Sequence, residues 1–114
     1  MYLVAWVGER PIGSGELLWS DPPELRYLHV GEQWQGRGVG TALIAEAERR
    51  CEGRSAIMVG VGLDNPRARR LYERLGFTGT GEYSTTTYTY VDATGPHEAT
   101  ETDEALVKHV PSPR

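Results

Sequence analysis

The first 30 residues carry a pattern of apolar and polar positions that is typical of β-strands. Residues 2–7 are all apolar or aromatic, and residues 12–19 form a second strand-like run after the turn-forming segment 8–11. The pattern predicts a hairpin. It ends at a loop, residues 20–23, whose two prolines cannot donate hydrogen bonds to a sheet.

A third strand is predicted at Glu24–Val30, and its apolar pattern is irregular. Leu25, Leu28 and Val30 are the apolar positions that we expect to face inward, so their spacing changes from three to two. One extra residue in a strand, a β-bulge, produces this change of spacing. The sequence therefore predicts a bulge within this strand.

Helical spacing follows between about residues 40 and 52. Apolar residues recur there every three or four positions, which predicts an amphipathic helix that ends near Gly53. The last apolar residue of this stripe is Cys51, which we expect to pack against the core rather than to react. The full apolar stripe is Val39, Ala42, Leu43, Ala47 and Cys51.

A second helix is predicted by the residues at its two ends. Asn65 is a favoured N-cap residue, Pro66 suits the first helical position, and Gly76 suits the position just after the helix. Its predicted apolar stripe is Ala68, Leu71, Tyr72 and Leu75. Between the helices, residues 55–61 are nearly all apolar, which predicts a strand buried on both faces.

The final third of the chain predicts a further hairpin. Residues 83–91 are mostly threonine and tyrosine, residues 92–96 read as a turn, and a returning strand is expected around 103–109. We expect its acidic residues, Glu98, Glu101, Asp103 and Glu104, to form a solvated face or to guard a sheet edge. His97 and His109 lack partners at ligand spacing, so no metal site is predicted.

Length and charge narrow the class of protein. With 114 residues, the chain is expected to form one domain over residues 1–110 with a tail at 111–114. A net charge of −4 argues against nucleic-acid binding. No run approaches 18 apolar residues, so no membrane contact is expected. No leader sequence is recognised and the chain has a single cysteine, so a cytoplasmic location is expected.

Between the third strand and the first helix lies a glycine-rich segment, 35–41. Its glycines occupy alternate positions, which lets the backbone turn sharply, and the helix that follows presents unpaired N–H groups. Such a segment can bind an anion, most naturally a phosphate. It matches neither a Walker A loop nor a Rossmann turn. Two alternatives remain. The segment is a glycine-rich turn that binds no ligand, or the chain is a nucleotide-binding domain. The residues of the segment are Gln35, Gly36, Arg37, Gly38, Val39, Gly40 and Thr41.

Two motifs together resemble one family. Gln35-x-x-Gly38-x-Gly40 resembles the pyrophosphate motif of the GCN5-related N-acetyltransferase (GNAT) superfamily, and residues 65–77 resemble its following motif. The resemblance implies an α/β fold with a mixed, mostly antiparallel twisted sheet and two main helices. It also implies an acetyl-CoA-dependent N-acetyltransferase that moves an acetyl group to the primary amine of a small molecule or peptide within a ternary complex.

The resemblance also implies roles for individual residues. Backbone N–H groups of 35–41 would bind the pyrophosphate of acetyl-CoA, with Arg37 adding charge, and the backbone near His29 and Val30 would polarise the thioester carbonyl. Asn65 would contact the coenzyme A arm. Tyr72 would protonate the leaving thiolate, and Glu24, eleven residues before Gln35, would deprotonate the amine, with His29 as its rival.

The chain departs from the family pattern at its start. It begins at what would be the family's second strand, without the usual first strand and first two helices, which wall the acceptor pocket in the family. Three interpretations follow. The pocket is open and suits a peptide amine; a second subunit completes it, as a homodimer; or the chain is a non-catalytic coenzyme A-binding or interaction module.

Overall fold

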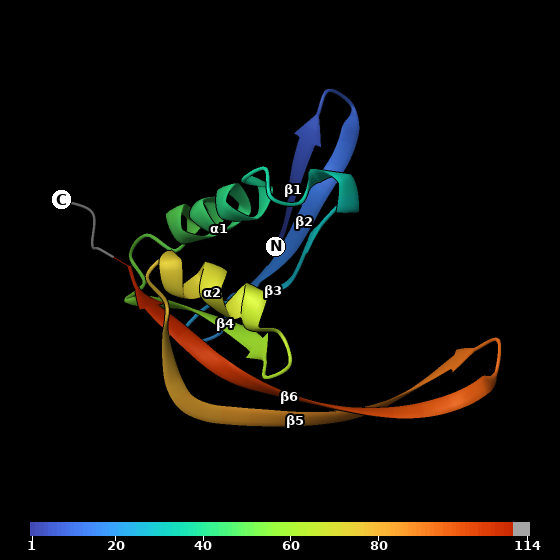
Figure 1. The fold of residues 1–114 in the computed structure, drawn as a ribbon. Helices are drawn as coiled ribbons and strands as arrows, with labels where there is room; N and C mark the ends of the chain where they lie inside the picture. Colours follow the sequence, from blue (N-terminus) through green and yellow to red (C-terminus); the bar gives the residue numbers. More distant parts are fainter. Residues whose placement is uncertain (111–114) are drawn as a thin grey trace. The chain divides into compact units, whose positions relative to one another are not determined.

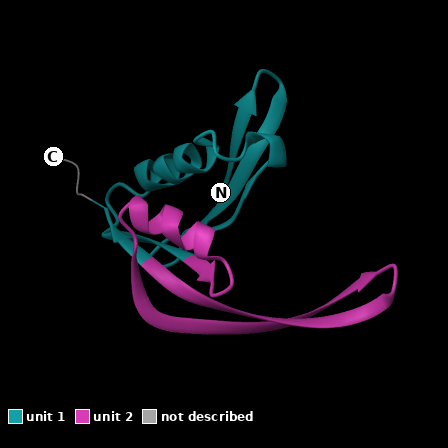
Figure 2. Ribbon diagram, in the orientation of Figure 1, with its two compact units in different colours: residues 1–59, 107–114 teal, residues 60–106 magenta. Residues whose placement is uncertain are grey.

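The computed structural model describes residues 1–110, and the predicted tail, 111–114, lies outside the described residues (Figure 1). The chain forms two compact units (Figure 2). The first unit comprises residues 1–59 and 107–114, and the second comprises residues 60–106.

Six strands form one sheet in the order β1-β2-β3-β4-β6-β5. β1 pairs with β2, and β2 with β3, in antiparallel fashion, whereas β3 and β4 are parallel. The predicted mixed sheet with two main helices is confirmed. The elements are β1 Tyr2–Val7, β2 Arg10–Leu18, β3 Glu24–Val30, the 3-10 helix η1 Glu32–Trp34, α1 Val39–Arg50, β4 Ala56–Gly62, α2 Pro66–Arg74, β5 Thr78–Asp92 and β6 Gly95–His109.

The predicted boundaries hold best in the first half of the chain. β1 and β3 have the predicted bounds, and α1 begins at Val39, one residue before the predicted start. The last two strands are longer than predicted, with 15 residues each. Neither helix of residues 1–110 is long and apolar enough to cross a membrane.

In the first unit, α1 packs closely on β2. A Cβ at Gly13 would lie 3.0 Å from Val39 Cγ1 and 3.3 Å from Leu43 Cδ1, so a side chain there would crowd the helix. The predicted stripe of α1 needs one correction, because Ile44 is buried whereas Ala42 is exposed. Ile44 is adjacent to Leu43, and the helix buries a stripe broad enough to include both. Cys51 is fully buried, as predicted, and burial raises the pKa of its thiol.

The predicted bulge lies in β3. Ser14 of β2 pairs with His29 and Glu16 pairs with Arg26, so one residue of β2 faces two residues of β3. Tyr27, within the bulge, has a φ of 55°, a left-handed backbone conformation that non-glycine residues rarely adopt. Its side chain is exposed. The bulge breaks the strict alternation of inward and outward side chains, and this explains the irregular apolar spacing.

In the second unit, one acidic residue of β6 contradicts the prediction. Glu104 was expected on a solvated face or an edge, but it is buried, with 6% of its surface exposed. Arg69 of α2 donates a hydrogen bond to it across 2.5 Å, and the backbone N–H of Gly81 donates another across 3.2 Å. Glu104 is therefore an internal link between α2, β5 and β6. Glu98 and Glu101 are exposed, and Asp103 is partly exposed, as predicted.

Candidate functional site

The glycine-rich segment leads from β3 into α1 through two left-handed turns of the backbone. Gly36 and Gly38 have φ values of 75° and 85°, which side-chain-bearing residues adopt only with strain. A Cβ at either glycine would meet no atom within 4 Å, so the space beside both residues is open. The side chain of Gln35 donates from Nε2 to the carbonyl of Val30 across 3.2 Å. This hydrogen bond ties the segment to the end of β3.

The first turn of α1 is free to bind an anion. Gly38 is its N-cap residue and provides no capping side chain, and the first turn contains no acidic residue. The first N–H groups of a helix have no partner within the helix, and they lie at the positive end of its dipole. The hydrogen bond from Ala42 N to Gly38 O, 3.0 Å long, marks where the helical ladder begins. The N–H groups that precede Ala42 therefore have no acceptor within the helix.

β3 and β4 pair over only a short distance, at the start of β3. Glu24 faces Met58 and Leu25 faces Val59, and the parallel register between the two strands ends there. From Arg26 onward β3 continues to pair with β2, on its other side. Since backbone groups of a strand need partners, the free side of β3 can pair with an extended ligand. Backbone groups of successive strand residues point to opposite edges, and Gly31 N donates to the carbonyl of Ile12 in β2. The free side therefore presents the backbone of Val30, whose carbonyl accepts from Gln35.

The two predicted base candidates lie at opposite ends of β3. Glu24 is its first residue and is half-buried, whereas His29 is exposed. Five residues separate them, which corresponds to about 16 Å along a strand. The structure therefore does not bring them together, and they stay alternatives.

The other predicted residues lie on α2, in the second unit. The Oδ1 atom of Asn65 accepts a hydrogen bond from Ala68 N across 3.1 Å, so Asn65 is the predicted N-cap. At the other end, Gly76 has a φ of 100°. The N–H groups of Gly76 and Phe77 donate to the carbonyls of Glu73 and Tyr72, each across 3.0 Å, and together they form a Schellman motif. Both predicted helix ends are confirmed.

Tyr72 lies in the last turn of α2 and has 8% of its surface exposed. Its ring packs edge-on against Phe77, with ring centroids 5.7 Å apart, and burial raises the pKa of its phenol. Within residues 1–110, no fully buried side-chain oxygen or nitrogen lacks a hydrogen-bond partner. The Tyr72 hydroxyl has no partner among these residues, so it is not fully buried. The hydroxyl therefore reaches solvent while the ring stays in the core.

The predicted site residues thus fall into two groups. Residues 35–41 and β3 belong to the first unit, and Asn65 and Tyr72 belong to the second. Sequence reasoning missed a pocket beside residues 35–41, between Arg10 and Trp34. A signal was present, because Trp34 directly precedes the glycine-rich segment, but Arg10 was interpreted only as part of a turn.

Comparisons with known proteins agree with this geometry. The sequence profile of the Acetyltransferase (GNAT) family matches residues 1–77. The fold is similar to the IAA acetyltransferase from Bacillus cereus ATCC 14579, with a TM-score of 0.74, 23% identity, and coverage of 95% of this chain and 76% of that one. It is also similar to the ribosomal-protein-S18-alanine N-acetyltransferase from Escherichia coli, with a TM-score of 0.70, 21% identity, and coverage of 100% and 70%.

A third similar structure is a GNAT family acetyltransferase from Elizabethkingia anophelis with acetyl-CoA bound. Its TM-score is 0.73 at 17% identity, and the match covers 95% of this chain and 74% of that one. No curated protein sequence matches the chain significantly. The structural likenesses show the fold, and the family profile matches 77 of the 114 residues. The chain therefore belongs to the acetyltransferase (GNAT) family.

Proposed function

We propose that this chain transfers an acetyl group from acetyl-CoA to a primary amine, of a small molecule or a peptide, within a ternary complex. One observation carries the proposal. An uncapped helix N-terminus with two left-handed glycines lies beside β3, whose pairing with β4 stops after two residue pairs. The first feature suits a pyrophosphate and the second suits an extended pantetheine arm, and acetyl-CoA contains both. A similar structure holds acetyl-CoA.

The residues of the first unit would bind and polarise acetyl-CoA. The N–H groups of Gly36–Thr41 would donate to the pyrophosphate, and the Arg37 guanidinium would add positive charge. The backbone of β3 at Val30 would pair with the pantetheine arm, and an N–H group there would donate to the thioester carbonyl. Acetyl-CoA supplies an activated acetyl group whose thiolate can leave.

Proton transfers would complete the reaction. The amine reaches the site largely as an ammonium, so Glu24, or alternatively His29, would remove a proton before the C–N bond forms. As the C–S bond breaks, Tyr72 would give its phenolic proton to the thiolate. A raised pKa keeps this phenol neutral, and so able to donate, throughout the physiological range. That Tyr72 lies beside the thiol is part of the proposal.

The alternative of the same fold is a non-catalytic coenzyme A-binding or interaction module, and Tyr72→Phe distinguishes it. Phenylalanine keeps the ring that packs on Phe77, so the fold and the affinity for acetyl-CoA should persist. Loss of a general acid should lower turnover by about 10²-fold or more. The first measurement is calorimetric titration of the chain with acetyl-CoA, with ADP and desulfo-CoA as comparisons, followed by an amine screen.

The outcomes of this experiment distinguish an acetyltransferase from a non-catalytic module and from a nucleotide-binding domain. Binding that requires the pantetheine arm, together with amine acetylation that Tyr72→Phe abolishes, supports the proposal. Binding without acetylation of any amine favours the non-catalytic module. Binding of ADP as tight as that of acetyl-CoA favours a nucleotide-binding domain, and no binding of any ligand contradicts all three.

A further inference from the structure

β1 is an unprotected edge of the sheet. It lies at one end of the strand order and pairs with β2 alone, so its other side has no partner within residues 1–110. The strand, residues 2–7, contains no charged residue and no proline. Proteins usually protect an edge strand with charges, prolines or bulges, because its free N–H and C=O groups otherwise pair with another strand.

The strand at the other end of the order is protected. β5 contains a left-handed glycine, Gly81, with a φ of 76°, and it carries the carboxylates Glu82 and Asp92. A left-handed residue interrupts regular pairing, and the carboxylates repel a second copy of the same strand. Since β1 has neither feature, the addition of a strand is favoured at β1.

The hydrogen bonds between β1 and β2 show which backbone groups of β1 are free. Met1 N donates to Leu17 O across 3.0 Å, and Leu17 N donates to Met1 O across 2.7 Å. Backbone groups of successive residues point to alternate sides of a strand. The odd-numbered residues of β1 therefore point toward β2, and the backbone groups of Tyr2, Val4 and Trp6 point to the free side.

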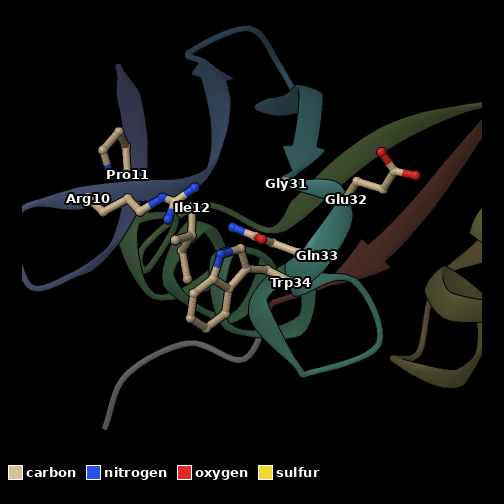
Figure 3. Close-up of a pocket in the computed structure, with 7 residues that line it drawn as sticks. All are labelled: Arg10, Pro11, Ile12, Gly31, Glu32, Gln33 and Trp34. Atoms are coloured by element: carbon tan, nitrogen blue, oxygen red, sulfur yellow. The ribbon is translucent and has the colours of Figure 1, made fainter.

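The same three residues carry exposed side chains. Tyr2, Val4 and Trp6 have 76%, 43% and 57% of their surface exposed. The exposed apolar face continues on β2 at Pro11, which pairs with Trp6. Pro11 lies on the opposite side of β2 from the buried Ile12 (Figure 3). An apolar, uncharged row of side chains thus accompanies the free backbone groups.

We propose that β1 pairs with β1 of a second copy of this chain, antiparallel about a two-fold axis at Val4. In this register Val4 faces the partner's Val4, and Tyr2 faces the partner's Trp6. All three outward-facing residues then form hydrogen-bonded pairs, and the two aromatic pairs add side-chain contacts. Glu16, opposite Tyr2 on β2, forms an ion pair with Arg26 across 3.1 Å, so its charge is compensated. The inference is independent of the proposed function, because β1 contains no residue assigned to acetyl-CoA or to proton transfer.

Sedimentation velocity of the full chain tests the inference. One paired strand buries less than the about 1,600 Å² of a standard interface, so we expect a reversible dimer with a dissociation constant on the order of 10 μM. Val4→Lys places two ammonium groups opposite each other at the axis, and like charges at such a pair are destabilising. The dissociation constant should therefore rise about tenfold or more. Val91→Lys is the matched control, because Val91 is an exposed valine of β5, and it should keep the native value.

Two further measurements test the register. Val4→Glu alone should also dimerise weakly, whereas an equimolar mixture of Val4→Glu and Val4→Lys should dimerise at least as tightly as the native chain, because opposite charges then face each other. In Val4→Cys, the paired Cα atoms would lie about 5.5 Å apart, within disulfide range. Mild oxidation should cross-link this variant but not Val91→Cys, and the native Cys51 is fully buried. Circular dichroism verifies that each variant is folded.

Three results would overturn the inference. The first is a native chain that stays monomeric up to about 500 μM, far above the expected dissociation constant. The second is a dimer that Val4→Lys leaves intact or that Val91→Lys weakens equally. The third is a mixture of the two charged variants that does not dimerise, together with no cross-link in Val4→Cys. None of these results bears on acetyl-CoA binding, so the proposed function would stand.

Discussion

Glu104 is the residue whose surroundings differ most from those that the sequence predicts. Its carboxylate is buried and accepts hydrogen bonds from Arg69 and from the N–H of Gly81. A Cβ at position 79 would lie too close to Glu104 Oε2, so a side chain there would displace the carboxylate. These interactions favour the charged form, so the hydrogen bond from Arg69, followed by that from Gly81, holds the pKa of the carboxyl below its usual value.

This lowered pKa predicts how stability depends on pH. Because the folded state favours the ionised carboxylate, Glu104 contributes stability above the carboxyl pKa of the unfolded chain, and this contribution is lost as the pH falls through the lower folded pKa. Glu104→Gln should therefore be less stable than the native chain at pH 7, and the two should converge towards pH 3. Urea unfolding midpoints at pH 7, 5, 4 and 3 measure this.

Glu98→Gln is the control for this prediction, since Glu98 is exposed on the same strand. It should follow the native chain at every pH. A constant difference between Glu104→Gln and the native chain over the whole range would contradict the assigned role of the charge.

The burial of Glu104 depends on a contact that is remote in the sequence. Four carboxylates occur within residues 98–104, and the sequence does not say which one faces a cation. The partner, Arg69, is 35 residues away, so the pairing depends on how β6 packs against α2. Trp34 and Arg10 raise the same difficulty, because 24 residues separate two side chains that share one pocket.

At the scale of elements, α2 could be predicted almost completely because its ends are local. The N-cap, the proline at the first helical position and the glycine after the helix are all encoded within residues 65–76, and each forms as expected. The bulge of β3 was also predicted, from the spacing of its apolar residues. The burial of Ile44 in place of Ala42 could not be predicted, because it depends on how α1 lies on β2.

The two proposed roles of Asn65 can be separated at this scale. Asn65→Ala removes the N-cap and should lower the free energy of unfolding by about 1 kcal/mol, whereas Asn65→Ser keeps a capping oxygen and should stay near the native value. Both variants lack the amide that would contact coenzyme A, so both should bind acetyl-CoA several-fold more weakly. Urea unfolding and calorimetry give the two quantities. Native affinity in Asn65→Ser would show that Asn65 is a cap alone.

At the scale of the whole molecule, the sequence predicts the sheet and the family but not the completed site. Residues 35–41 and Tyr72 belong to different compact units, and their proposed cooperation comes from the family resemblance rather than from either unit alone. The family profile ends at residue 77, which leaves β5 and most of β6 outside it. The homodimer and the cytoplasmic location stay predictions.

The β5–β6 hairpin provides the last prediction. All 15 residues of β5 are exposed, and beyond residue 87 the hairpin carries tyrosines rather than a core. Thr85 pairs with Thr102, and Thr87 pairs with Thr100, through side-chain oxygens 3.0 Å apart. Replacing residues 88–99 by Asn-Gly, a favoured two-residue hairpin turn, keeps both pairs and the link from Arg69 to Glu104.

The shortened chain should fold and bind acetyl-CoA, because every residue assigned to the coenzyme lies within residues 1–77. A two-stranded ribbon without a buried face contributes little stability, so the free energy of unfolding should change by less than about 1 kcal/mol. Calorimetry should give a Kd for acetyl-CoA close to the native value, and any change in acetylation rate would then come from the amine side of the reaction. Loss of acetyl-CoA binding in a folded shortened chain would mean that the hairpin helps to form the coenzyme site.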